Sequence, residues 1–256
     1  MYTAGIDIGS ISTKAVIMKD SRVLADRVIF TGYNAEGAGR KAFEMVLTDL
    51  NLAASAVSRI VATGYGRKGA AFADKAVTEI MCHAAGARFL NPQIRFIIDI
   101  GGQDSKAILL DEAGKVVNFA MNDKCAAGTG RFLEVMARAL EVDLEEFGRL
   151  SLQAETPSKI SSLCTVFAES EIISLIARGE TRENIIAGIH ESICVRVLAM
   201  ANRVGIKSPV MMTGGVARNI GVVRAFEKVI GSPVEVSPYA QVNGAIGAAL
   251  LAQREL

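Results

Sequence analysis

Short runs in which apolar and polar residues alternate open the chain and recur about ninety residues later. Residues 5–24 (GIDIGSISTKAVIMKDSRVL) align with residues 97–117 (IIDIGGQDSKAILLDEAGKVV), so that Asp7 falls on Asp99 and Lys14 on Lys106. Each copy reads as a strand that ends in Asp and Gly, a tight turn, and a second strand of β-branched and aliphatic residues. A third strand is predicted after each copy, over 22–30 and 115–121. An internal repeat of this kind predicts two structurally similar units.

Helical periodicity follows each set of strands. Residues 35–50 are amphipathic, and the segment 131–142 places its apolar side chains on one face, namely Phe132, Val135, Met136 and Leu140. The pattern predicts further helices over 165–179 and 181–205, a short strand over 209–215 that leads into another helix, and a closing helix over 241–256. Three strands followed by helices, twice, indicate an α/β fold of two lobes with a ligand cleft between them. The lobes are predicted at 1–95 and 96–242, and residues 243–256 are predicted to return to the first lobe.

Composition and charge narrow the choice of partners. The formal net charge is +1 and the basic residues are scattered, which gives no electrostatic case for nucleic acid or a membrane surface. No run of 18 apolar residues occurs, so no membrane span is predicted. The N-terminus MYTAGIDIGS lacks a basic region followed by an apolar segment, which predicts a cytoplasmic protein. With four cysteines and no secretory signal, the thiols are predicted to be free or to bind a metal.

Two glycine-containing turns are candidates for binding phosphate. In DIGSISTK (7–14) and DIGGQDSK (99–106), a strand ends in Asp and is followed by Gly and small polar residues. Such turns can direct backbone N–H groups at phosphate oxygens, and glycine has no Cβ to block the approach. Asp7 and Asp99 could hold the Mg²⁺ of a bound triphosphate between the lobes.

A third turn, MTGGVARN (212–219), lets backbone approach a purine or ribose through Gly214 and Gly215. None of the three turns is a P-loop. Each turn alone could be a hairpin or a strand-to-helix connection that happens to contain glycine. Three such turns in this order, two of them repeats, favour a nucleotide site.

The order of these turns, together with NGAIGAAL (243–250), resembles the actin, sugar-kinase and heat-shock-chaperone ATPase superfamily. The resemblance implies a duplicated actin-like (ribonuclease H-like) ATPase fold that binds ATP or ADP, although the fold alone does not determine function. It implies Mg²⁺-binding or water-positioning roles for Asp7 and Asp99, and a catalytic role for Gln103 beside them. It also implies nucleotide contacts from the three turns and one further residue: Gly9, Ser10, Ser12, Thr13, Lys14, Gly101, Gly102, Gln103, Gly214, Gly215 and Gln241.

Cys125 and Cys164 each precede a predicted helix, where free N–H groups and the helix dipole stabilise anionic sulfur. Two thiolates are too few for a structural zinc site or a 4Fe–4S cluster, each of which takes four ligands. Two chains on a two-fold axis would supply four. From composition alone, buried structural cysteines remain the commoner interpretation. Cys82 and Cys194 fall within helices beside apolar residues and are predicted to be structural. His83 and His190 show no metal-ligand spacing and are predicted to lie on helix faces.

Two cysteine-containing segments are specific to one branch of that superfamily. NDKCAAGTGRFLEVMA, SSLCTVFAESEIIS, ATGYGRK and IIDIGGQDSKAI together resemble the activator component of 2-hydroxyacyl-CoA dehydratases, over essentially the whole chain from Gly5 to about Leu251. The resemblance implies a homodimer with one 4Fe–4S cluster held by Cys125 and Cys164 of each chain. It implies a reduced ferredoxin or flavodoxin as electron donor, and ATP hydrolysis that drives one electron onto a partner dehydratase. The acyl-CoA that the dehydratase uses does not follow from it.

The same resemblance suggests how ATP would act. Closure of the lobes on Mg·ATP is predicted to shift the helices 129–140 and 165–178 and thereby change the exposure and potential of the cluster. Glu169 and Glu171 could position water, contact a partner or lie on an exposed helix face. Three alternatives stay open: the ATPase subunit of a benzoyl-CoA reductase, a small-molecule kinase of the superfamily, and a non-redox ATPase with structural zinc.

Overall fold

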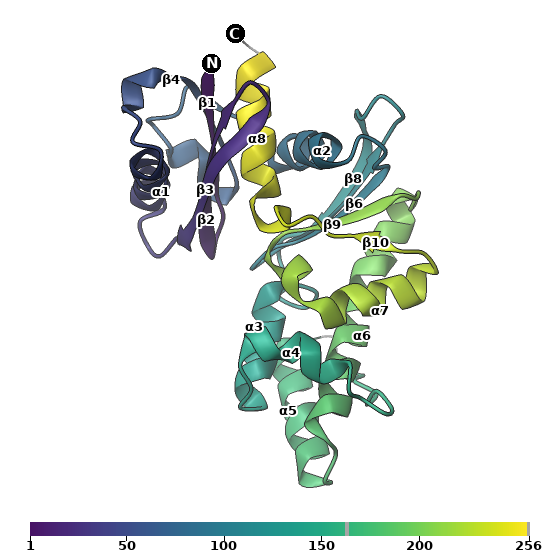
Figure 1. Cartoon of the computed structure of the whole chain (residues 1–256). Helices are drawn as coiled ribbons and strands as arrows, with labels where there is room; N and C mark the ends of the chain where they lie inside the picture. Colours follow the sequence, from purple (N-terminus) through teal and green to yellow (C-terminus); the bar gives the residue numbers. More distant parts are fainter. Residues whose placement is uncertain (162–163, 255–256) are drawn as a thin grey trace.

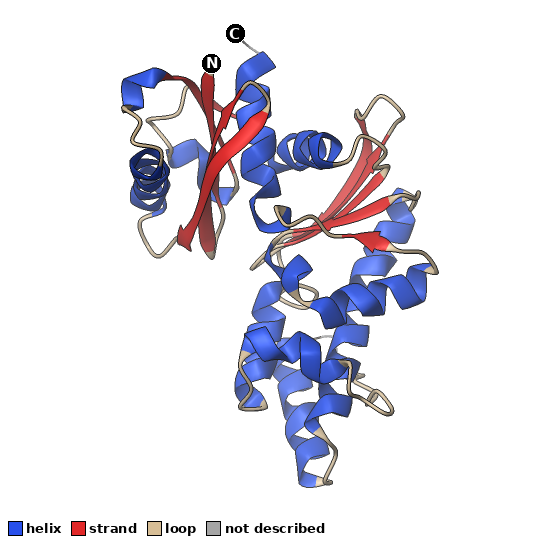
Figure 2. Ribbon diagram, in the orientation of Figure 1, coloured by secondary structure: helices blue, strands red, loops and turns tan. Residues whose placement is uncertain are grey.

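Two mixed five-stranded sheets form the frame of the molecule (Figures 1 and 2). The structure is a computed structural model that describes residues 1–161 and 164–254, so parts of the predicted segments SSLC and 241–256 lie outside the described residues. The first sheet has the order β3-β2-β1-β4-β5 and the second β10-β9-β6-β7-β8. The strands of the first sheet are β1 (Tyr2–Ile8), β2 (Ser12–Lys19), β3 (Arg22–Phe30), β4 (Val57–Thr63) and β5 (Lys75–Ala76). Those of the second are β6 (Phe96–Ile100), β7 (Ser105–Leu110), β8 (Val116–Asn122), β9 (Val210–Thr213) and β10 (Val234–Glu235).

The repeat predicted from the sequence is present in the strand register. Strands β1 and β2 are antiparallel and pair Asp7 with Lys14, and β6 and β7 pair Asp99 with Lys106 in the same way. The repeat extends further than the sequence indicated. Strand β4 runs parallel to β1 and places Thr63 beside Asp7, as β9 places Thr213 beside Asp99. The prediction of a duplicated α/β fold is therefore confirmed.

Helices cover both faces of the first sheet. Helix α1 (Ala35–Asp49) begins at Asn34, whose side chain accepts a hydrogen bond from the backbone N–H of Gly37, and it buries Phe43 and Val46 against one face. Helix α8 (Asn243–Arg254) packs its Ala245 and Ile246 on the other face. The predicted return of the C-terminal helix to the first sheet is thus seen in the packing, whereas the lobe boundaries at residues 95 and 242 remain predictions.

Helix α2 (Glu79–Leu90) packs instead on the second sheet and crosses α8 between the two sheets (Figure 1). The crossing is close because glycine lies at the contact. A Cβ on Gly247 would collide with the backbone carbonyl of Cys82, and a Cβ on Gly86 with that of Asn243. Each helix therefore touches both halves of the molecule, which places the first residues of α2 beside the ends of β6 and β7.

The other face of the second sheet carries a helical layer that extends away from it (Figures 1 and 2). Its helices are α3 (Gly130–Ala139), α4 (Leu144–Ser151), α5 (Thr165–Ala177), α6 (Arg182–Val204) and α7 (Ile220–Ile230). Phe132, Met136 and Leu140 are buried as the amphipathic pattern predicted. The helix predicted over 129–140 is α3 to within one residue at each end, whereas α4 was not predicted. Glu141 adopts a left-handed backbone with φ of 53°, which ends α3 and allows α4 to begin after Asp143.

Helix α6 is long and apolar enough to cross a bilayer, and among the described residues no other helix meets that criterion. Most of the apolar window is buried inside the protein, where Ile189, Ile193 and Val197 join the main hydrophobic core. The helix is therefore the core helix of this layer.

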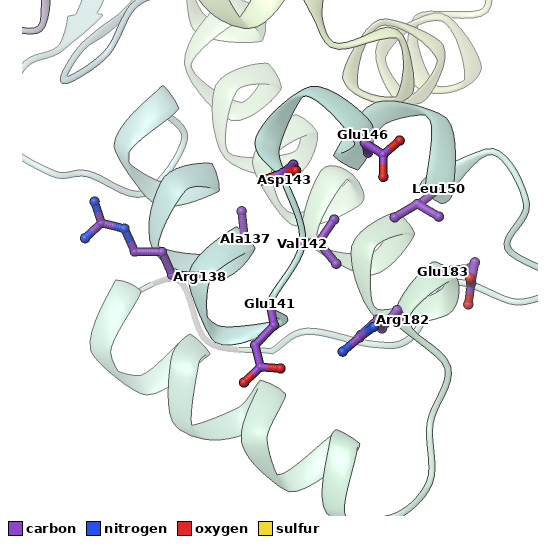
Figure 3. Close-up of a pocket in the computed structure, with 9 residues that line it drawn as sticks. All are labelled: Ala137, Arg138, Glu141, Val142, Asp143, Glu146, Leu150, Arg182 and Glu183. Atoms are coloured by element: carbon purple, nitrogen blue, oxygen red, sulfur yellow. The ribbon is translucent and has the colours of Figure 1, made fainter.

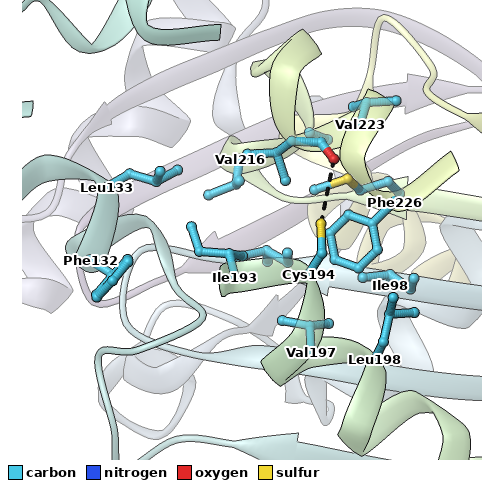
Figure 4. Packing of buried hydrophobic residues seen from close by; sticks show 14 of the residues in the cluster. Ile98, Phe132, Leu133, Ile193, Cys194, Val197, Leu198, Val216, Val223 and Phe226 are labelled. Carbon is cyan, nitrogen blue, oxygen red and sulfur yellow. Dashed lines mark hydrogen bonds between the residues drawn. The ribbon is translucent and has the colours of Figure 1, made fainter. Parts of the chain in front are cut away.

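The two cysteines predicted to be structural lie in the core. Cys194 and Phe226 belong to the same buried cluster, and the Cys194 thiol donates to the carbonyl oxygen of Val222 at 3.9 Å (Figure 4). Cys82 is also fully buried. Burial raises the pKa of the Cys82 thiol to about 12 and that of Cys194 well above its usual range. Both thiols therefore stay protonated, and the prediction of structural roles is confirmed.

His190 lies on a face of α6, as predicted, and that face is buried. It is 1% exposed between α4, α6 and α7, with its ring edge-on to Phe147 at 5.5 Å. Its Nε2 faces the side-chain amide of Asn219 at 3.3 Å, and its Nδ1 has no hydrogen-bond partner among the described residues. Burial lowers the pKa of His190 to about 3, so the ring is neutral in the folded protein.

This burial predicts a loss of stability in mild acid. The unfolded chain takes up a proton on His190 below about pH 6.5, whereas the folded chain does not until about pH 3. Its contribution is therefore complete above about pH 6.5 and is lost as the pH falls. Between pH 6.5 and 4.5 we expect His190 to lower the free energy of unfolding by about 2–3 kcal/mol. Urea unfolding at several pH values would measure this, with His190→Gln expected to flatten the curve over that range. An unchanged slope in the variant would contradict the assignment.

Candidate nucleotide site

Two Asp–Lys pairs lie at the ends of corresponding strands, and both aspartates are buried. The Lys14 Nζ is 3.2 Å from Oδ2 of Asp7, and the Lys106 Nζ is 3.0 Å from Oδ2 of Asp99. Both pairs follow from the cross-strand register, which sets each lysine directly opposite its aspartate. The duplication thus places two carboxylates, each already beside a cation, at the predicted nucleotide site.

The second pair belongs to a larger charged cluster that the sequence did not reveal. Lys106 Nζ also lies 2.6 Å from Asp104 Oδ2 and 2.8 Å from Glu79 Oε2, and the lysine is 2% exposed. Burial alone would lower the pKa of Lys106, but its three carboxylates hold it well above the usual range. Burial would likewise raise the pKa of Asp99, but His83 and Lys106 hold it well below its usual range. Asp99 and Lys106 are therefore both charged.

Glu79 and Asp104 reach the cluster by different routes. Asp104 is part of the turn DIGGQDSK, and its position there was a usable signal. Burial is the largest cause that raises the pKa of the Asp104 carboxyl. Glu79 begins α2, and only the packing of that helix on the second sheet brings it to Lys106. No spacing along the chain indicates that contact.

His83 lies on a face of α2, as predicted, but that face is buried against the charged cluster. It is 6% exposed, and its Nδ1 lies 3.2 Å from the Thr213 hydroxyl and 3.4 Å from the Asp99 carboxylate. Thr213 in turn donates a hydrogen bond to Asp99 at 2.8 Å. Gly244 lies on the other side of the ring, where a Cβ would be 3.1 Å from His83 Nε2 and 3.2 Å from Asp7 Oδ2. The two aspartates predicted to act together thus flank the crossing of α2 and α8.

The first phosphate turn has its predicted tight geometry. The N–H of Gly9 donates to the carbonyl of Ser12 at 3.1 Å, and Ser10 and Ser12 are half-buried at the turn. Thr13 differs from its predicted role in contacting phosphate. Its side chain is fully buried and its hydroxyl pairs with Thr31 at 2.9 Å, which in turn donates to the Gly9 carbonyl. Thr13 therefore supports the turn from beneath, because its strand position points it into the first lobe.

The second phosphate turn has a matching hydrogen bond and meets the first directly. The N–H of Gly101 donates to the carbonyl of Asp104 at 2.9 Å, and Gln103 is exposed at the tip. Gly102 lies under the side chain of Ile11, and a Cβ there would collide with that side chain. The two turns thus pack together at a point where only glycine is accommodated.

This contact makes Gly102→Ala a probe of how the turns come together. The added methyl group would push Ile11 away and separate the turns, at a cost of about 1–3 kcal/mol if the turns must approach to bind nucleotide. We expect about a tenfold weaker affinity for ATP, measured by titration calorimetry. Ile11→Ala in the same chain should restore most of the affinity, because it removes the colliding atoms. Failure of this second change to restore binding would show that Gly102 acts in another way.

The predicted adenosine loop brings its three predicted residues together. Gly214 has φ of 86°, a backbone conformation that favours glycine, and its N–H donates to the carbonyl of Ala240 at 2.9 Å. A Cβ on Gly215 would lie 3.9 Å from the Gln241 amide nitrogen, and Gln241 accepts a hydrogen bond from Arg218 at 3.2 Å. Gly64, with φ of 88°, occupies the corresponding place after β4. The loops 63–68 and 213–218 are therefore a second repeated pair.

The two cysteines predicted to bind a cluster differ in their surroundings. Cys164 is exposed and is the N-cap residue of α5, as predicted. Cys125 is half-buried and precedes α3 by several residues, because the N-cap of that helix is Thr129. The first two N–H groups of α3 are not free, contrary to the prediction. Those of Gly130 and Arg131 donate to the carbonyls of Gly101 and Gly102 at 2.9 and 2.8 Å.

Glu171 is engaged within its own chain. Its carboxylate accepts hydrogen bonds from the backbone N–H of Ser161 at 3.0 Å and from the Ser161 hydroxyl at 2.8 Å. It therefore ties α5 to the segment before Cys164. Nothing comparable assigns a role to Glu169. Over residues 1–161 and 164–254, no three His, Cys, Asp or Glu side chains are grouped so that they could hold a metal ion.

A cavity of about 530 Å³ lies in the helical layer, away from the three turns (Figure 3). Its charged lining combines Arg138 and Arg182 with four carboxylates: Glu141, Asp143, Glu146 and Glu183. The excess of negative charge disfavours a phosphate group. The nucleotide site is therefore assigned to the turns and not to this cavity.

Comparison with known proteins bears on this assignment. The sequence pattern of the BadF/BadG/BcrA/BcrD ATPase family matches residues 4–252. The chain belongs to this family. The predicted ATPase activity is thereby confirmed. The activator of lactoyl-CoA dehydratase from Anaerotignum propionicum is 53% identical over 98% of this chain and 97% of that protein.

Two solved structures of this ATPase family are very similar. The (R)-2-hydroxyglutaryl-CoA dehydratase component A of Acidaminococcus fermentans has a TM-score of 0.96 at 46% identity, over 100% of this chain and 98% of that one. The activator of 2-hydroxyisocaproyl-CoA dehydratase from Clostridium difficile, with bound ADPNP, has a TM-score of 0.95 at 46% identity, over 100% and 95%. The resemblance to dehydratase activators and the actin-like fold are both confirmed.

Two more distant similarities concern the alternatives. One of the benzoyl-CoA reductase subunits of Thauera aromatica is 36% identical over 97% of this chain and 92% of that protein. A ROK family glucokinase from Streptomyces griseus has a TM-score of 0.63 at 14% identity, over 99% of this chain and 100% of that one, which shows a shared fold alone.

Proposed function

We propose that this ATPase activates a 2-hydroxyacyl-CoA dehydratase by passing it one electron at low potential, at the expense of ATP. The observation that carries the proposal is the exposed thiol of Cys164 at the first turn of α5, a helix whose apolar side chains are largely uncovered. A cysteine with a purely structural role would be expected in the core and not at an exposed helix start. Similarity to three dehydratase activators, each at 46% identity or more, supports the same function.

Helix α5 has the character of a surface between two copies of the chain. Only Ala168 and Ile172 are fully buried along it, whereas Phe167 and Ile173 are 67% and 57% exposed. Val166 and Ile176 are exposed as well. Apolar side chains on one exposed helix mark a protein–protein contact. A two-fold axis near the start of α5 would bring Cys164 of the two chains together.

The donor set suits a cluster shared by two such chains. Of the four cysteines, only Cys125 and Cys164 are not fully buried, so each chain offers two thiols and a dimer four. A 4Fe–4S cluster takes four cysteine thiolates and would supply one-electron transfer. A reduced ferredoxin or flavodoxin would deliver the electron. The thiols of Cys82 and Cys194, being protonated and enclosed, do not compete for iron.

The nucleotide would bind between the two phosphate turns. Backbone N–H groups of the turns would face its phosphates, and Gly214 and Gly215 would leave room for the adenosine beside Gln241. Mg²⁺ keeps most of its waters and takes few protein carboxylates, so the two aspartates at the turns would suffice. Asp7 and Asp99 would hold that ion through water and orient the water that attacks the γ-phosphate.

Activation of a dehydratase in trans would test the proposal. A purified 2-hydroxyacyl-CoA dehydratase, kept anaerobic with dithionite as reductant, would be assayed for release of the unsaturated acyl-CoA. We expect turnover only when this chain and Mg·ATP are both present, and we expect a small fraction of the chain per dehydratase to suffice. No activation, with ATP hydrolysis intact and iron absent under strict anaerobiosis, would refute the electron-transfer function.

A second function has support from the benzoyl-CoA reductase subunit among the relatives. In that case the chain would be one subunit of a heteromeric enzyme and would be stable only with its partners. A homodimer that persists alone, by analytical ultracentrifugation, would count against this alternative. Phosphorylation of a small molecule is supported by fold similarity alone.

A further inference from the structure

The start of α3 is bonded directly to the second phosphate turn. Besides the two hydrogen bonds to the carbonyls of Gly101 and Gly102, a Cβ on Gly130 would lie 3.1 Å from the Gly101 oxygen and 3.4 Å from the side chain of Val216 in the adenosine loop. Gly130 therefore touches two of the three turns assigned to the nucleotide. A larger residue would hold α3 away from them.

The peptide planes of the turn make this contact sensitive to a bound phosphate. A trans peptide unit directs its C=O and its N–H to opposite sides. The carbonyls that hold α3 share their peptide units with the N–H groups of Gly102 and Gln103. An anion bound to those N–H groups polarises the same units and strengthens the hydrogen bonds on their far side. Phosphate binding would thus tighten the hold on the first turn of α3.

Between α3 and Cys125 the chain is a continuous hydrogen-bonded turn. The side-chain amide of Asn122 donates to the carbonyls of Cys125 and Ala127 at 2.8 and 3.1 Å. The N–H and hydroxyl of Thr129 both donate to the carbonyl of Ala126. Only a few residues separate the thiol from the helix start, and each end of the segment is held. A change at Gly130 is therefore transmitted to Cys125.

The segment of Cys164 is held by other parts of the molecule. The carbonyl of Cys164 accepts from the N–H of Ala168 in its own helix, and Ser161 is bound by Glu171. Further back, Thr156 and Ser158 are bound by Asn184 at the start of α6. These anchors belong to the helical layer and not to the phosphate turns.

We propose that the two peptide units between Gly101 and Gln103 couple bound nucleotide to α3 and, through it, to Cys125, so that nucleotide changes the surroundings of Cys125 more than those of Cys164. The proposal rests on the nucleotide position given under the proposed function. In this proposal Gly130 and Asn122 are positioning residues, and the two cysteines have different roles. Cys125 reports the nucleotide state, and Cys164 is a constant ligand.

Thiol labelling of iron-free protein would test this without any cluster. The chelator-treated protein would be alkylated with iodoacetamide, with and without Mg²⁺ and AMPPNP, and each cysteine quantified by peptide mass spectrometry. We expect nucleotide to slow the alkylation of Cys125 by about fivefold or more and that of Cys164 by less than about twofold. Cys82 and Cys194 serve as internal references that stay unlabelled, because both are buried. Equal effects on Cys125 and Cys164, or none on Cys125 while AMPPNP is bound, would overturn the proposal.

Two variants separate coupling from binding. Gly130→Pro removes the N–H that donates to Gly101, and proline suits the first position of a helix that follows the extended Thr129, whose ψ is 170°. Asn122→Ala releases the Cys125 carbonyl at the far end of the link. Each variant should reduce the nucleotide effect on Cys125 to less than about twofold. Asn122→Ala should still bind AMPPNP with unchanged affinity. If Gly130→Pro fails to bind AMPPNP, the labelling of Cys125 in Asn122→Ala is the test of the coupling.

Leu144→Pro provides the matched proline control. It places the same residue at the first position of α4, where Leu144 is 41% exposed, and it should keep the full nucleotide effect on Cys125. Loss of the effect in this control, or its retention in Asn122→Ala, would refute the link. Iron analysis of the anaerobic protein is a separate measurement. A protein without iron would refute the shared cluster and leave the labelling result valid. Equal nucleotide effects on the labelling of the two cysteines would refute the coupling and leave the shared cluster standing.

Discussion

Cys164→Ser is expected to remove nearly all of the iron from anaerobically purified protein, and Cys125→Ser to do the same. The wild-type protein should contain about four irons per dimer, since a 4Fe–4S cluster takes four thiolates and each chain has two that are accessible. A serine hydroxyl stays protonated at neutral pH and is a far weaker ligand for iron than a thiolate. ATP-dependent activation of a dehydratase should be lost with the iron. Hydrolysis of ATP alone should stay within about threefold, because neither cysteine touches the phosphate turns.

Cys82→Ala is the control for this pair. It removes a thiol that is fully buried and protonated, at a cost of about 1–2 kcal/mol in stability. The iron content should not change. Iron that persists in both Cys125→Ser and Cys164→Ser, or that is lost in Cys82→Ala at an unchanged fold, would show that the cluster ligands have been assigned to the wrong residues.

The fold could be predicted because its signals are local. Each repeated hairpin is marked by the sequence Asp-Ile-Gly at the end of its first strand, and the register then sets Lys14 opposite Asp7 and Lys106 opposite Asp99. Amphipathic periodicity located most helices for the same reason. Helix α4 was not predicted, because the left-handed conformation of Glu141 separates it from α3 and that residue type gives no sign of it. The extension of the repeat to β4 and β9 was missed because little beyond Thr-Gly is shared there.

The candidate site could be predicted only where it lies on a single stretch of chain. The glycine turns and the position of Cys164 at the start of a helix were of this kind. Glu79 and His83 join Asp99 and Lys106 because α2 crosses to the second sheet, and that crossing depends on glycines in α2 and α8 whose spacing suggests nothing by itself. Thr13 was assigned to phosphate because it belongs to the turn, but strand alternation points it into the first lobe. Local pattern thus located the turns, and tertiary packing decided which side chains reach the candidate site.

Asp99→Asn is expected to have the largest effect on ATP hydrolysis. The substitution keeps the size of the side chain but removes the charge that faces Lys106, His83 and Thr213. On the proposed role of Asp99 in holding Mg²⁺ and orienting the attacking water, we expect kcat to fall by about 100-fold or more. The loss of stability should be smaller, about 2 kcal/mol, because Asp104 and Glu79 still neutralise Lys106. The comparison of these two magnitudes distinguishes a functional carboxylate from a merely structural one.

The pH dependence of the free energy of unfolding tests the charge of Asp99 independently of ATP hydrolysis. The folded pKa of Asp99 lies below its value of about 4 in an unfolded chain, so its contribution is complete above that pH and is lost as the pH falls through it toward the folded value. Asp99→Asn should therefore flatten the acid part of the stability curve below about pH 4, a range in which His190 has already lost most of its effect. Asp111→Asn is the control, since Asp111 only accepts a hydrogen bond from the N–H of Lys115 in an exposed turn. If Asp99→Asn hydrolysed ATP within about threefold of the wild-type rate, the buried Asp–Lys pair would be part of the scaffold, and catalysis would have to depend on Asp7.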